Sequence, residues 1–145
     1  LQRSYQGGYL EMIQSDLDKL GQFLARKRHT AFELSVNDCN TLAVEWHDLR
    51  YGTNKLDNIK GQYHNNRTRI QFAKEYLSAE TWLKTNGYKQ VKTKKEGDLI
   101  LVKHKYWSVV YIYFFGVAYT FEEGKNLVQI NPKSFPKDQI EIWRR

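Results

Sequence analysis

The only cysteine of this 145-residue chain, Cys39, stands where its thiol could act as a nucleophile. It follows Asn37 and Asp38 and opens a segment whose apolar residues recur at helical spacing. The dipole and the free N–H groups at a helix start favour a thiolate. A cysteine nucleophile also needs a base within hydrogen-bond reach and a polar group that orients this base. Because free cysteine also packs well in cores, Cys39 is either a reactive thiol or a buried apolar side chain.

Four helices are expected to position this thiol. Their predicted extents are residues 9–28, a segment from Asp38 to just before Gly52, a stretch around residues 70–77, and a short helix from Ser78 to Asn86-Gly87. The first helix carries an apolar stripe that predicts packing either on its own domain or on a neighbouring subunit. A polar loop is predicted for residues 52–66.

The second half of the chain has the composition of short β-strands. The predicted strands are residues 97–102, 108–115, 117–123, 126–131 and 140–145, with a tight turn at Glu123-Gly124. Helices followed by an antiparallel meander predict an α+β domain.

Composition limits the possible functions. One cysteine excludes an internal disulfide and a structural cysteine-based zinc site, and we expect neither a metal ion nor another cofactor. The longest apolar run, residues 107–121, is rich in aromatic and β-branched residues and shorter than the roughly 18 residues of a membrane span. The net charge of +7 predicts an acidic partner, or serves solubility alone.

Several motifs occur in the order found in a known family. The Asp-Cys pair at a helix start, then "GDLILV" at residues 97–102 and a final hairpin, resemble the papain-like fold of NlpC-type cell-wall peptidases. The chain is more similar to a divergent group of such domains encoded by bacteriophages. The shared motifs are "NDC-x-x-x-A-x-W" and a final strand with Trp and Arg, here Asn37, Asp38, Cys39, Ala43, Trp46, Trp143 and Arg144. The resemblance implies an N-terminal helical extension at residues 1–31 and an NlpC-like α+β domain at residues 32–145.

This resemblance places Cys39 at the position of the family's nucleophile and Ser108 where the family has its histidine. A serine hydroxyl is no useful base near neutral pH. We therefore interpret Cys39 as a vestigial nucleophile and favour a protein without enzymatic activity. In the alternative, Cys39 is a nucleophile and His104, in the turn before Ser108, is its base. The other histidines, His29, His47 and His64, are interpreted as surface residues.

The resemblance and the missing histidine together predict a structural component of a phage virion, in the tail or tail tip. In this hypothesis the peptidase-like fold is an assembly module that binds acidic surfaces of other virion proteins. The protein is then expected in the virion and, during assembly, in the host cytoplasm. The expected interface residues are Arg26, Lys27, Arg28, Trp107 and Trp143.

Two other functions remain open from the sequence. One is an active cysteine hydrolase that cleaves peptidoglycan peptides during phage DNA entry. The other is DNA contact, since lysine clusters alternate with aromatic residues, although no recognised nucleic-acid-binding motif is present.

Overall fold

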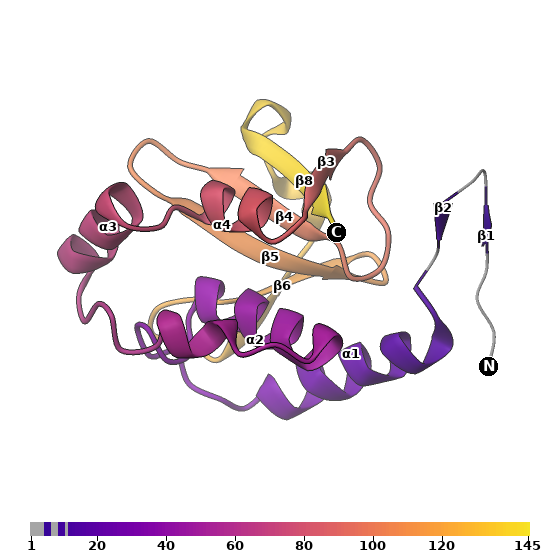
Figure 1. Ribbon diagram of the computed structural model, residues 1–145, viewed down its shortest axis with the longest axis horizontal. Helices are drawn as coiled ribbons and strands as arrows, with labels where there is room; N and C mark the ends of the chain where they lie inside the picture. Colours follow the sequence, from indigo (N-terminus) through magenta and orange to yellow (C-terminus); the bar gives the residue numbers. More distant parts are fainter. Residues whose placement is uncertain (1–4, 7–8, 11) are drawn as a thin grey trace.

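The computed structural model describes residues 5–6, 9–10 and 12–145. Helices precede a six-stranded antiparallel sheet, so the predicted α+β class is confirmed (Figure 1). The helices are α1 (Gln14–Lys27), α2 (Cys39–Tyr51), α3 (Asn66–Glu75) and α4 (Ala79–Thr85). The strands are β1 (Tyr5–Gln6), β2 (Tyr9–Leu10), β3 (Lys89–Val91), β4 (Leu99–Lys103), β5 (Ser108–Phe114), β6 (Val117–Phe121), β7 (Leu127–Ile130) and β8 (Ile140–Arg144).

The helix boundaries follow local signals that the sequence contains. Asp38, Asn65 and Ser78 each accept a hydrogen bond from the backbone three residues later and so cap α2, α3 and α4. Gly52 ends α2 in the left-handed conformation, as expected for a helix C-terminus. The first helix is shorter than predicted. It begins at Gln14, because Tyr9 and Leu10 form β2 instead.

The large sheet has the order β3-β8-β4-β5-β6-β7. Strands β4 to β7 form the predicted meander, but the expectation that the last strand continues it is wrong. β8 crosses back and pairs with β4 on one side and β3 on the other. The crossing segment covers the second face of the sheet, where Phe135 and Ile140 pack against Ile100, Val102 and Ala118. The short strand β3 was not predicted.

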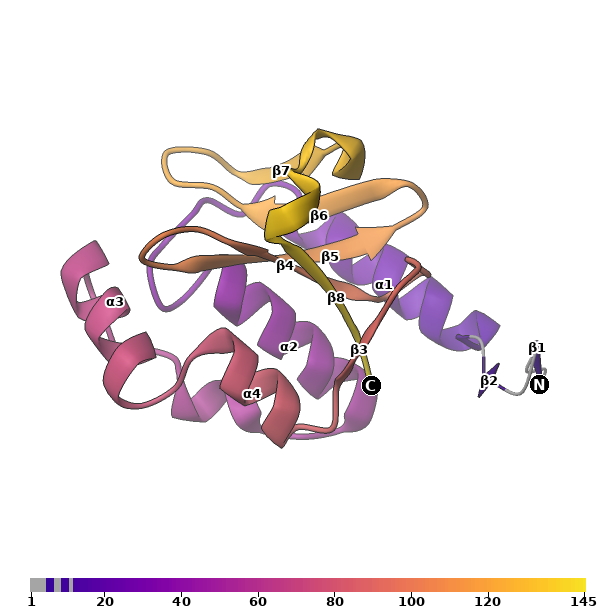
Figure 2. The same ribbon diagram turned by 90° about the horizontal axis from the view of Figure 1, so that it is seen from above.

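Helices α1 and α2 lie side by side against the other face of the sheet (Figures 1 and 2). The apolar stripe of α1 supplies Leu20, Phe23 and Leu24 to the same core as α2 and the sheet. This stripe therefore packs on its own domain and is not available to a neighbouring subunit. Among the described residues, none of the helices has the length and apolar character needed to cross a membrane.

Candidate functional site

The start of α2 is fixed by the buried carboxylate of Asp38. The carboxylate accepts hydrogen bonds from the Thr41 backbone N–H at 2.9 Å, the Ser35 backbone N–H at 2.8 Å and the Tyr63 hydroxyl at 2.6 Å. Thr41 completes a capping box, because its hydroxyl accepts the Asp38 N–H at 2.8 Å. Asp38 therefore has the structural role of a helix cap, with Tyr63 as an added buried donor.

The Cys39 side chain is buried, with 4% of its surface exposed. Burial, and secondarily the negative charge of Asp38, raise the pKa of the thiol to about 11. Backbone hydrogen bonding at Val110 of β5 opposes this rise but does not cancel it. At pH 7 a group with this pKa is ionised in only about one molecule in ten thousand, so Cys39 is a neutral thiol.

The histidine expected as the alternative base is not bonded to this thiol. The Cys39 Sγ instead donates a long hydrogen bond to Asn40 Oδ1, at 3.8 Å. His104 lies exposed in the β4–β5 hairpin, where its ring is centred 6.2 Å from that of Trp107. Ser108, which the resemblance aligns with the family's histidine, is the first residue of β5. The described residues therefore contain no cysteine–histidine pair at Cys39.

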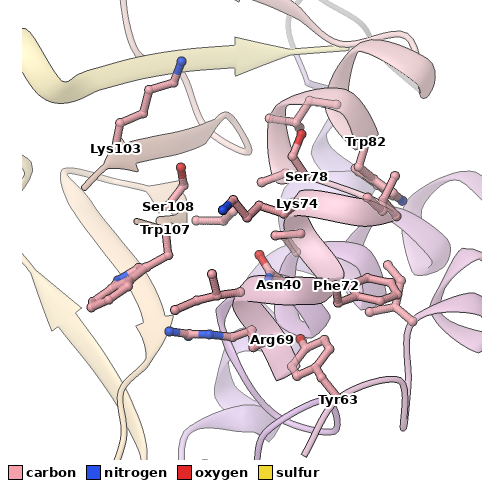
Figure 3. Close-up of a pocket in the computed structure, with 18 of the residues that line it drawn as sticks. Asn40, Tyr63, Arg69, Phe72, Lys74, Ser78, Trp82, Lys103, Trp107 and Ser108 are labelled. Atoms are coloured by element: carbon pink, nitrogen blue, oxygen red, sulfur yellow. The ribbon is translucent and has the colours of Figure 1, made fainter. Parts of the chain in front are cut away.

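A cavity of about 400 Å³ opens beside α2, between α3, the start of α4 and the β4–β5 hairpin (Figure 3). Asn40, Ser108 and His104 line it, whereas Cys39 does not. Its wall is mostly apolar and aromatic: Ala43, Val44, Ile59, Tyr63, Ile70, Phe72, Leu77, Trp82, Leu83, Leu99, Tyr106, Trp107 and Val110. The buried Cys39 thiol is therefore not part of the wall of this cavity.

The ionised side chains that line this cavity all carry positive charge. Arg69, Lys74, Lys103 and Lys105 contribute to the wall, and no Asp or Glu does. Lys103 is neutralised by ion pairs with Glu80 at 2.6 Å and Glu141 at 2.9 Å. Arg69 was not predicted as a site residue, because helical spacing indicates which residues share a face of α3 but not which segments of the chain pack against that face.

The expected interface residues differ in their environments. Trp107 is partly exposed at the cavity, and Arg26 and Arg28 are exposed near the end of α1. Lys27 pairs with Glu45 at 2.6 Å. Trp143 is only 2% exposed and packs in the core, so its ring cannot contribute to a surface contact. An interface at this protein's surface would therefore rest on the other four residues.

The motif residues of the final strand have structural roles. Arg144 of β8 forms two hydrogen bonds with the buried Asp98 carboxylate, from Nε to Oδ1 at 2.8 Å and from Nη2 to Oδ2 at 2.7 Å. Asp98 precedes β4, so this pair joins the "GDLILV" segment to the last strand. Trp46 and Trp143 are both core residues. These motifs therefore serve the fold, whatever the protein binds.

His47 is buried, contrary to the expectation of a surface histidine. It lies in α2 two turns beyond Cys39, packs against Trp82, and its Nδ1 is 2.7 Å from the Tyr88 hydroxyl. Burial, assisted by the positive charge of Arg145, lowers the pKa of the imidazole. His47 directly follows the core residue Trp46, and the sequence does not show whether the His47 side chain is exposed. Only the position of α4 decides that it is covered.

Acidification is expected to destabilise the protein through His47. As the pH falls through about 6.5, an unfolded histidine takes up a proton that the folded state resists, so stability decreases towards the lower folded pKa. The melting temperature should therefore fall between pH 7.5 and 5.0, and less steeply in a His47→Gln variant. The exposed His64→Gln variant is the control and should keep the wild-type slope. Equal slopes in all three proteins would contradict this role.

Within the described residues, no group of three or more His, Cys, Asp and Glu side chains is placed to hold a metal ion. Comparison with known proteins finds no matching family model, no matching curated protein and no matching solved structure.

Proposed function

We propose that this protein is a non-catalytic structural component of a bacteriophage virion, in the tail or tail tip, that uses a degenerate NlpC-like fold as an assembly module. The state of Cys39 carries the non-catalytic part of the proposal. A buried thiol with a pKa of about 11 and no imidazole bonded to it lacks both properties of a cysteine nucleophile. The phage assignment depends on the motif resemblance of residues 32–145.

The position of Cys39 in the fold supports the same proposal. It begins α2 and faces β5 at Val110, which is the arrangement that a papain-like enzyme needs for catalysis. In the proposed alignment Ser108 stands where the base would be, and the buried Cys39 thiol does not line the cavity that a ligand could enter. Such a scaffold retains a cleft and a basic surface, with which it can bind partners without chemistry.

Alkylation of Cys39 tests the non-catalytic assignment directly, because this thiol is the only one in the chain. We expect iodoacetamide to react with the folded protein at least about 100-fold more slowly at pH 7.5 than with the urea-unfolded chain. The rate should keep rising to about pH 11, whereas the unfolded chain should show an ordinary thiol profile near pH 8.5. A rate plateau below pH 7 would mean a stable thiolate and would overturn the assignment.

The alternative function is a working hydrolase of peptidoglycan peptides. One observation favours it: His104 lines the same cleft as Asn40, next to the start of α2. Digestion of purified muropeptides that is lost in both Cys39→Ala and His104→Ala variants would support this alternative.

The virion proposal has its own test, since mass spectrometry of purified particles should find the protein at a constant copy number. Its absence from the particles would exclude a structural role.

A further inference from the structure

The cavity between α3 and the β4–β5 hairpin combines an apolar wall with positive charge only. We propose that this cavity binds a small organic acid, in which a carboxylate ends an apolar group, and that Arg69 is the ion-pair partner of the carboxylate. This proposal does not depend on a virion role. It depends on the positive charges of the cavity, on its apolar wall and on the unpaired Nε of Arg69.

Arg69 projects from α3 into the cavity, next to Trp107 (Figure 3). Its Nε atom is buried and has no hydrogen-bond partner among the described residues. The guanidinium carbon lies 5.6 Å from the centre of the Trp107 ring, a cation–π contact that orients the group but satisfies no N–H. Buried polar groups are normally hydrogen-bonded, and leaving a charged one unpaired is costly. An acceptor in the cavity would remove this cost.

The charges around Arg69 select for an anion. Lys74 and Lys105 also line the cavity, and neither has an ion pair among the described residues. The Lys105 ammonium group lies 5.3 Å from the centre of the Tyr106 ring, and both residues line the cavity. Lys103 is already neutralised by Glu80 and Glu141. A planar guanidinium matches a carboxylate in geometry, because it can donate two parallel hydrogen bonds, and the Nε of Arg69 has no partner among the described residues.

The rest of the cavity selects for an apolar group attached to that carboxylate. Val44, Leu83, Leu99 and Val110 form part of the wall, together with the aromatic rings of Phe72 and Trp82. A volume of about 400 Å³ lies in the range of small-molecule sites, which runs from about 300 to 1,000 Å³. A phosphate or a sugar would leave this wall unfilled. A free aliphatic acid and a peptide chain that ends in an apolar residue share the required chemistry.

Binding of octanoate, followed by calorimetry and by tryptophan fluorescence, to which Trp82 and Trp107 in the cavity wall contribute, tests the proposal. We expect octanoate to bind saturably. Acetate, which lacks the apolar chain, and octan-1-ol, which lacks the charge, should both bind much more weakly. An Arg69→Gln variant should bind octanoate about 10- to 100-fold more weakly, as expected for loss of charge-assisted hydrogen bonds. Arg67→Gln is the matched control, because Arg67 is exposed on the same helix and does not line the cavity.

A second variant and a second ligand complete the test. Arg69→Lys keeps the charge but not the planar fork, so its affinity should lie between those of the wild type and Arg69→Gln, with an unchanged melting temperature showing that it folds. A peptide ending in a free Phe carboxylate, compared with its C-terminal amide, distinguishes a peptide source from a free acid. The proposal is overturned if neither octanoate nor the peptide binds, or if Arg69→Gln and Arg67→Gln bind them equally.

Discussion

Replacement of Asp38 by alanine is expected to lower the free energy of unfolding by about 3–7 kcal/mol. Loss of a helix cap accounts for about 1 kcal/mol of this. The remainder comes from the buried Tyr63 hydroxyl and the Ser35 backbone N–H, each of which loses its acceptor at a cost of about 1–3 kcal/mol. Urea unfolding at constant pH measures the change, provided that the slope with denaturant stays constant.

Asn65→Ala is a matched control for this substitution. Asn65 caps α3 with the same kind of box, in which Thr68 returns the hydrogen bond, but its site is exposed. We therefore expect a loss of only about 1 kcal/mol there. Equal losses at the two positions would show that the buried bonds of Asp38 to Tyr63 and Ser35 do not stabilise the start of α2, and with it the position of Cys39.

Removal of the Arg144 side chain is expected to cost about 3 kcal/mol or more. An Arg144→Ala variant leaves the Asp98 carboxylate buried, at 2% exposed, without the guanidinium that donates two hydrogen bonds to it. This pair joins the residue before β4 to the end of β8, so its loss should also loosen the pairing of the last strand. Chemical denaturation measures the first effect, and amide hydrogen exchange in β8 measures the second.

A double substitution and a surface ion pair provide the controls. Asp98→Asn combined with Arg144→Gln removes both charges together and should cost less than the sum of the single changes. Lys125→Ala breaks an exposed pair with Glu122 and should cost at most about 1 kcal/mol. If Arg144→Ala were as mild as Lys125→Ala, the Asp98–Arg144 pair would not contribute to the stability of the sheet.

The environment of Cys39 shows which of two opposing effects decides the ionisation of a thiol. The start of a helix favours the thiolate, which is why the sequence made Cys39 a candidate nucleophile. Burial favours the neutral thiol, and the adjacent Asp38 carboxylate acts in the same direction. The net result is a raised pKa, so the position of a cysteine at a helix start does not by itself make a nucleophile.

The secondary structure was accessible from the sequence wherever local chemistry determines it. The caps at Asp38 and Ser78 and the glycine after α2 are short-range signals, and each marks a boundary in the structure. The limits of α1 and the short strand β3 were missed, because tertiary pairing overrides weak local preference at chain ends and in three-residue strands. The papain-like identity of the fold remains a proposal that depends on the motifs.

The sequence by itself determined the order of helices before strands and the cap at the start of α2. Only the tertiary structure decided that Cys39 and His47 are buried, that β8 crosses back to β4, and that Arg69 meets Trp107 in a cavity without acidic side chains. Capping and periodicity act between residues a few positions apart, so one segment contains them. Burial, strand order and cavity charge arise between segments far apart in the chain, and they exist only once the core has formed.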